Sequence, residues 1–109
     1  MAGWYEISKN ELSEFRFVLK AANAEVILRS QQYTSKASAL NGVTSVQTNA
    51  GDDARYELKT AHDGRFFFNL LAGNAQVIGT SQMYASESTR ATGIASVKAN
   101  GGSSDVREL

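Results

Sequence analysis

The chain contains no cysteine, one histidine and no excess of charge of either sign. Without cysteine, disulfides, thiolate metal sites and thiol nucleophiles are all excluded. The 11 basic and 11 acidic residues are shared almost evenly between the two halves of the chain, so neither half has the basic excess of a nucleic-acid or anionic-membrane binder. No apolar run approaches the length of a membrane span.

The start of the chain bears on the cellular location of the protein. Residues 1–5 contain no basic segment followed by an apolar stretch, so we expect no secretion signal. The lack of cysteine is compatible with a reducing compartment. The sequence therefore predicts a cytoplasmic protein.

What the sequence does contain is an internal repeat, because the second half matches the first at an offset of 51 positions. The register holds without a gap from Tyr5, which matches Tyr56, to the C-terminus. Identical residues include Phe15, Phe17, Leu19, Gln31, Tyr33 and Gly42, which match Phe66, Phe68, Leu70, Gln82, Tyr84 and Gly93. A repeat of about 50 residues is near the lower limit for independent folding, so the two copies should share one core.

Each repeat begins with residues that predict three short strands. Residues 15–21 and 66–72 alternate between one face that both copies keep and another that differs, as expected of a strand with one packed face. Residues 22–24 and 73–75 predict tight hairpins, in which asparagine would adopt the left-handed conformation that such turns need.

A helix is predicted to follow the strands of each repeat. Ser35 and Ser86 are the predicted N-caps, and residues 49–51 and 100–102 end the helices with asparagine and glycine. The apolar side of each helix is predicted at Leu40, Val43 and Val46, or Ala91, Ile94 and Val97.

These elements predict an α+β fold with internal pseudo-twofold symmetry, in which both helices pack on one face of an antiparallel sheet. We expect residues 1–109 to form a single domain made of two repeats, at about 4–53 and 55–104. Residues 54–59 both close the first repeat and open the second, and a closing strand is expected within residues 105–109.

Several segments of the first copy resemble a known family. The run from Phe15 to Ile27, with Ser35–Val43 and Ser45–Asn49, is similar to the repeat of the YegP-like family of uncharacterised bacterial proteins, and the chain resembles its duplicated subgroup. The second copy departs from the pattern at Glu87–Arg90, where the first has Lys36–Ala39. The resemblance implies a small antiparallel sheet with helices, and it implies no known activity, cofactor or catalytic residue.

The tract before each helix is the first candidate site. Its members are Gln31, Tyr33 and Ser35, and Gln82, Tyr84 and Ser86. Free amides and the helix dipole favour anions at a helix N-terminus, so a carboxylate or phosphate could bind there. The alternative is that the tyrosines pack against the helix while the glutamines face water.

A stripe of small and polar residues along each helix is the second candidate. It consists of Ser38, Gly42, Ser45 and Asn49, repeated as Thr89, Gly93, Ser96 and Asn100. A glycine within a helix costs about 1 kcal/mol relative to alanine, so its presence in both copies indicates a close approach to the backbone. The approaching group could be the other helix, a strand or a ligand, and packing between the two helices is the simplest interpretation.

The third candidate is apolar and belongs to the second copy alone. Phe67 and Leu71 stand where the first copy has Arg16 and Lys20, on the strand face expected to point away from the helices. Exposed apolar groups on such a face indicate partner binding, unless Trp4 or a loop covers them.

No residue set in the chain predicts catalysis, a metal or a cofactor. His62 lies in a turn sequence without the partners that acid–base or metal chemistry needs.

We expect a non-catalytic binding or protein-interaction module, whose partner is an unknown protein or small ligand. We also expect a monomer that behaves like an internal dimer. The alternatives are an anion at the helix N-termini or single-stranded nucleic acid on the open sheet, bound by Arg16, Lys20 and Arg29 beside Trp4. The second copy lacks Arg16 and Lys20, which weakens the nucleic-acid alternative.

Overall fold

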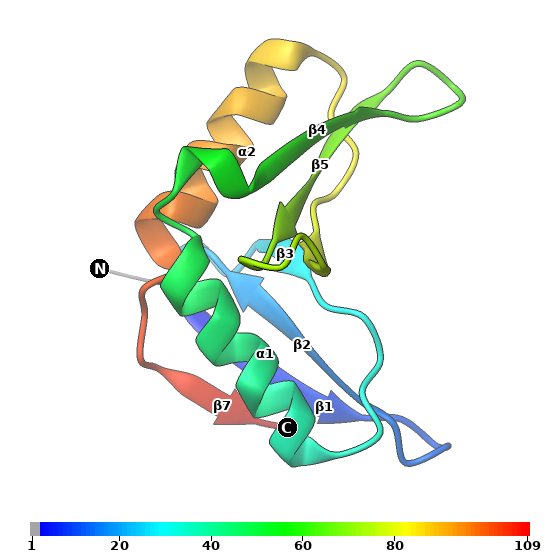
Figure 1. Ribbon diagram of the computed structural model, residues 1–109, viewed down its shortest axis with the longest axis vertical. Coiled ribbons are helices and arrows are strands. Elements are labelled where there is room, and N and C mark those ends of the chain that lie inside the picture. Colours follow the sequence, from blue (N-terminus) through cyan, green and yellow to red (C-terminus); the bar gives the residue numbers. More distant parts are fainter. Residues whose placement is uncertain (1–2) are drawn as a thin grey trace.

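The computed structural model describes residues 3–109, which form two repeats of three strands and a helix, followed by a closing strand (Figure 1). The first repeat comprises β1 (Trp4–Lys9), β2 (Phe15–Lys20), β3 (Val26–Arg29) and α1 (Lys36–Asn49). After a 3₁₀ turn at Asp53–Arg55, the second comprises β4 (Tyr56–Thr60), β5 (Phe66–Leu71), β6 (Val77–Thr80) and α2 (Glu87–Asn100), and β7 (Val106–Glu108) ends the chain. The predicted α+β fold is confirmed. The prediction of no secretion signal rests partly on Met1 and Ala2, which lie outside the described residues.

All seven strands form one sheet in the order β4-β5-β6-β3-β2-β1-β7. The two repeats meet at its centre, where Arg29 of β3 lies opposite Thr80 of β6, its own counterpart at the offset of 51. Neighbouring strands are antiparallel except β1 and β7, which are parallel. The prediction of a wholly antiparallel sheet is therefore wrong at this edge, where β7 pairs with a strand at the other end of the described chain to which no hairpin joins it.

Both helices pack on one face of the sheet and each one contacts strands of both repeats (Figure 1). Helix α1 contacts β2, β5 and β6, while α2 contacts β5, β3 and β2. Fully buried side chains between helices and sheet come from the conserved strand face of both copies, including Phe17, Leu19, Phe68 and Leu70. The core is therefore built jointly by the two repeats.

Two equivalent tyrosines connect the repeats at the helix ends. The Tyr5 hydroxyl donates to the carbonyl of Gly101, at the end of α2, and the Tyr56 hydroxyl donates to the carbonyl of Ala50, at the end of α1, each at 2.6 Å. Burial raises the pKa of both phenols, so both remain protonated donors at neutral pH. Each repeat thus satisfies a terminal carbonyl of the other repeat's helix.

The helix N-caps are confirmed, whereas the predicted apolar side is partly wrong. Ser35 Oγ accepts a hydrogen bond from the Ser38 amide at 3.1 Å, and the equivalent serine of the second repeat adds a capping box. Leu40 and Ala91 are exposed. The side of α1 that faces the sheet is made of Ala39, Gly42, Val43 and Val46. The predicted apolar stripe and the small-residue stripe therefore share one buried face.

Alanine, and not asparagine, adopts the left-handed conformation in the hairpins. Ala24 and Ala75 have φ angles of 69° and 68°. Asn23 acts through its side chain, because its Oδ1 accepts a hydrogen bond from the backbone amide two residues on at 3.1 Å, and Asn74 does the same. These are Asx turns, in which the asparagine itself need not be left-handed.

Candidate functional site

The tyrosine before each helix lies over the helix glycine. The Tyr33 ring stacks on Phe17 with centroids 6.2 Å apart, and a Cβ added at Gly42 would lie 2.5 Å from Tyr33 Oη. The same arrangement recurs in the second repeat among Tyr84, Phe68 and Gly93. The group that approaches the glycine is therefore a tyrosine ring of the same repeat, and the interpretation that the two helices pack together at these glycines is wrong.

The other predicted residues of this tract are not part of the packing over the glycines. Gln31 and Gln82 are exposed, as the packing alternative predicts. The hydroxyls of Ser35 and Ser86 are occupied as N-caps. Burial raises the pKa of Tyr33, so its phenol is neutral at physiological pH.

Acidic side chains lie at both helix N-termini. Lys36 Nζ, at the start of α1, pairs with Glu108 Oε1 of β7 at 2.5 Å. Helix α2 begins with Glu87, whose side chain is 76% exposed. Glu87 satisfies the preference of the α2 N-terminus for negative charge, while Glu108 pairs with the lysine that starts α1, and both carboxylates would repel an incoming anion.

A cavity of about 350 Å³ opens between α2 and the β2–β3 hairpin of the first repeat. It brings together Gln82, Tyr84 and part of the small-residue stripe (Thr89, Gly93 and Ser96) with Asn23 and Glu25 of the hairpin. The Tyr84 hydroxyl is buried and has no hydrogen-bond partner in the described part of the chain. Of the predicted site residues, Ser86, Phe67 and Leu71 do not line this cavity, and neither do those of the first repeat.

Phe67 and Leu71 lie on the sheet face that the helices leave open, and both are half-buried. Asn69 stands between them on β5 and binds Glu57 and Thr80 through its amide group. Val77, opposite Leu71 on β6, is 41% exposed. The apolar groups of this face are therefore divided by a polar strip.

The first repeat's half of the open face is occupied by a cluster of paired charges. Glu6 pairs with Lys20 at 3.1 Å and accepts a hydrogen bond from Trp4 Nε1 at 2.9 Å, and these contacts lower the pKa of its carboxyl. The guanidinium of Arg107 lies 4.2 Å from the Trp4 ring centre. Trp4 and Lys20 are thus engaged within the protein, while Arg16 remains exposed.

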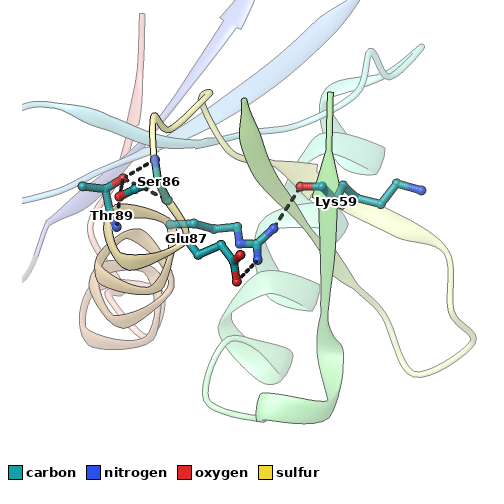
Figure 2. Close-up of polar contacts among 5 residues, drawn as sticks. Lys59, Ser86, Glu87 and Thr89 are labelled. Atoms are coloured by element: carbon teal, nitrogen blue, oxygen red, sulfur yellow. Dashed lines mark hydrogen bonds and ion pairs between the residues drawn. The ribbon is translucent and has the colours of Figure 1, made fainter. Parts of the chain in front are cut away.

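Arg90 is a buried charged residue that the sequence analysis does not identify. Its side chain lies over the Phe66 ring at 5.2 Å. It also donates to the Lys59 carbonyl at 3.0 Å and lies 3.9 Å from the Glu87 carboxylate, and these two polar contacts are drawn as dashed lines in Figure 2. A buried arginine needs such partners. The sequence could have indicated Arg90 through its counterpart Ala39. The two copies differ in charge at this position, although the rest of the buried helix face is shared.

Two site classes receive no support from the described residues. Within residues 3–109, no three histidine or acidic side chains are grouped so as to hold a metal ion. No helix in this part of the chain has the length and hydropathy needed to cross a membrane.

Comparison with known proteins identifies two copies of one domain. A family model described as a domain of unknown function, DUF1508, matches residues 12–57 and again residues 61–108. The UPF0339 protein YegP of Escherichia coli O157:H7 is 60% identical over 108 residues, which are 99% of this chain and 98% of that protein. A UPF0339 protein of Acinetobacter baylyi is 57% identical over 109 residues, covering 100% of this chain and 98% of the relative.

Two solved structures share the fold over almost the whole chain. The solution NMR structure of E. coli YegP, a protein of unknown function, has a TM-score of 0.94 at 58% identity and covers 99% of this chain and 93% of that one. The solution NMR structure of a UPF0339 protein from Shewanella oneidensis also has a TM-score of 0.94, at 51% identity, and covers 100% of this chain and 92% of that one. The chain therefore belongs to the UPF0339 (YegP) family, and it carries the DUF1508 domain as a tandem pair.

Proposed function

We propose that this protein is a non-catalytic binding module that contacts a protein partner through the helix-free face of its sheet. The observation that carries the proposal is the change between repeats on that face, where Phe67 and Leu71 replace Arg16 and Lys20. Phe67 and Leu71 are half-buried, and Val77 beside Leu71 is 41% exposed. Contact with a partner would remove this apolar area from water.

Two other ligand classes fit the geometry less well. Single-stranded nucleic acid would need free basic and aromatic groups, but Lys20 pairs with Glu6, and Trp4 lies between Glu6 and Arg107. A small anion at the helix N-termini would meet the carboxylates of Glu108 and Glu87. A protein partner requires neither free basic residues nor a vacant helix N-terminus.

The protein-partner proposal is tested with Phe67→Ser and a matched control at the equivalent position, Arg16→Ser. Immobilised wild type and Arg16→Ser should retain the same partner from a lysate of the source cells. Phe67→Ser should retain about tenfold less, as expected for removal of an aromatic contact at an interface. Equal capture by all three proteins, each checked for a folded spectrum, would reject the open face as the contact surface.

A second candidate function is binding of a small polar ligand in the cavity beside α2. The unpartnered hydroxyl of Tyr84 favours it, because a buried donor without a partner is costly unless a ligand or water accepts its hydrogen bond. The Ser96 hydroxyl and the amide of Asn23 suit a ligand with hydroxyl or carbonyl groups, whereas the Thr89 hydroxyl is engaged with Ser86 in the capping box.

An NMR screen with sugars, polyols and amino acids tests the cavity. A ligand should shift the amide signals of residues 89–96, and Ser96→Leu, which fills the cavity, should abolish the shifts. The equivalent change in the first repeat, Ser45→Leu, should leave them intact. Identical shifts in both variants would place the ligand elsewhere and contradict the cavity site.

A further inference from the structure

Within residues 3–109 the outer side of β4 carries no neighbouring strand, although the equivalent strand of the first repeat is covered. Residues 4–9 of β1 pair with β2 just as residues 56–60 of β4 pair with β5. On its other side β1 pairs in parallel with β7, but β4 is the last strand of the sheet formed by residues 3–109 (Figure 1). The internal symmetry therefore defines a strand position beside β4 that these residues leave empty.

The vacancy arises because one segment has two roles. The first domain match ends at residue 57, within β4, and the second ends at residue 108, within β7. In the second repeat this final segment is free to cover β1 of the other repeat. In the first repeat it continues as the opening strand of the second repeat, so it cannot also cover β4.

We propose that the open edge of β4 binds an extended segment of a partner protein, parallel to β4, in the way that β7 binds β1. The segment carries an apolar residue followed by two basic residues. This inference rests on the proposed function as a protein-interaction module, and it names a second contact surface and the chemistry of the partner. Strand addition to a sheet edge is a common mode of peptide recognition.

The main-chain groups needed for this pairing point outward from β4. Hydrogen-bonding groups alternate between the two sides of a strand. On β1 the Tyr5 amide donates to the Asp105 carbonyl at 2.8 Å and the Ile7 carbonyl accepts from the Leu109 amide at 2.9 Å, and these two partners flank β7. The equivalent residues of β4 are Tyr56 and Leu58. The Tyr56 amide donates to the Asp53 carbonyl, which leaves the Tyr56 carbonyl and both groups of Leu58 for an added strand.

The apolar side chain at the centre of the edge is uncovered on β4. Ile7 of β1 is 3% exposed, whereas its counterpart Leu58 is 57% exposed. In β7 the residue that faces the core is Val106, which lies opposite Tyr5 and packs against the buried cluster. An apolar residue placed opposite Tyr56 would occupy the equivalent position and shield Leu58.

The charges beside β4 favour a basic segment. In the first repeat Glu6 has Lys20 as its partner and lies near Arg107 of β7. Its counterpart Glu57 lies opposite Asn69, whose amide donates to its carboxylate at 3.0 Å. The counterpart of Lys20 is Leu71, and Glu57 forms no ion pair within the described chain. A basic residue at the position equivalent to Arg107 would supply the missing charge.

The helix N-terminus beside the edge has the opposite charge in the two repeats. Lys36 starts α1 and pairs with Glu108 of β7. Glu87 starts α2 and its side chain is 76% exposed. It lies 3.9 Å from Arg90, which donates to the Lys59 carbonyl of β4 (Figure 2). The segment that occupies the edge should therefore carry a basic residue where β7 carries Glu108.

The test uses two peptides based on residues 103–109, one with the native sequence and one with Glu108→Lys, titrated into the ¹⁵N-labelled full-length protein. The Glu108→Lys peptide should shift the amides of residues 56–60 and bind about fivefold more tightly than the native peptide, since one repulsion becomes an attraction. In the protein variant Glu87→Lys the native peptide should bind more tightly than the Glu108→Lys peptide. The Lys36→Glu variant serves as the control, because its charge change lies at the other edge and should leave the order unchanged.

Three results would overturn the proposal. The first is a titration that leaves the amide signals of residues 56–60 unshifted, and the second is a ranking of the two peptide affinities that Glu87→Lys does not change. The third is a set of shifts on β4 that depend on protein concentration without peptide, which would mean that a second copy of the chain pairs there. Peptide binding by Phe67→Ser is measured in parallel. If Phe67→Ser still binds the peptide and still retains every lysate partner, the open-face proposal alone is rejected and the edge site is supported.

Discussion

Replacing Phe68 by alanine is expected to destabilise the protein by about 3–5 kcal/mol, the range for removing a large aromatic side chain from a core. Phe68 is fully buried, stacks on Tyr84 and meets the edge of Tyr56 at 5.6 Å. Both helices contact β5, the strand that carries Phe68. The loss should therefore lower the stability of both repeats together.

Urea unfolding followed by amide signals from both repeats measures this effect. In Phe68→Ala the midpoints of β2 and β5 signals should fall by the same amount, and the equivalent change Phe17→Ala should behave alike. If the β2 signals of Phe68→Ala kept the urea midpoint of the wild type, the repeats would unfold independently, and the shared core would be rejected.

Adding one methyl group to the helix glycines is expected to have the second largest effect. The new Cβ of Gly42→Ala would lie 2.5 Å from Tyr33 Oη and 2.8 Å from Phe17 Cε2. Overpacking of this kind costs about 1–3 kcal/mol, and the higher helix propensity of alanine returns about 1 kcal/mol. We therefore expect a net loss of up to about 2 kcal/mol for Gly42→Ala, and a similar loss for Gly93→Ala beneath Tyr84.

Two comparisons separate the close contact from a general effect of alanine. Gly51→Ala is the control, because a Cβ there meets nothing within 4 Å, and its stability in urea should match wild type. In the second repeat, adding Tyr84→Phe to Gly93→Ala removes the closest atom but leaves the ring Cζ 2.5 Å from the new Cβ, so it should recover only part of the loss. If Gly42→Ala unfolded at the same urea concentration as Gly51→Ala, the tyrosine would not be what excludes a side chain at this position.

Features fixed by neighbouring residues could be predicted from the sequence. The alternation of residues 15–21 identified the buried Phe17 and Leu19 correctly, because a strand has only two faces and one had stayed the same in both copies. Ser35 and Ser86 were correct N-caps, since a cap depends on the next three residues alone. The comparison of copies also placed Phe67 on the face away from the helices.

Features that depend on distant residues could not be predicted. The helix side that faces the sheet includes Gly42 because a tyrosine ring fills the space above it, and helical spacing alone favoured Leu40. The parallel pairing of β7 is with β1, at the other end of the described chain. Arg90 is buried because Phe66 and the Lys59 carbonyl happen to lie beside it, and no local pattern indicates those partners. The cavity joins α2 to the other repeat's hairpin, so it exists only in the assembled fold.

The parallel pair β1–β7 also determines how the protein would respond to force. It joins the first described strand to the last, with Tyr5 opposite Val106 and Ile7 opposite Glu108. Traction applied to the two ends of the chain in opposite directions would slide these strands past each other, because they run the same way. Their hydrogen bonds lie across the direction of pulling and would have to break together, and not one after another as in an unzipping hairpin. Such shear geometry makes the terminal strands a mechanical clamp, so extension of the chain would begin only after this pair had ruptured.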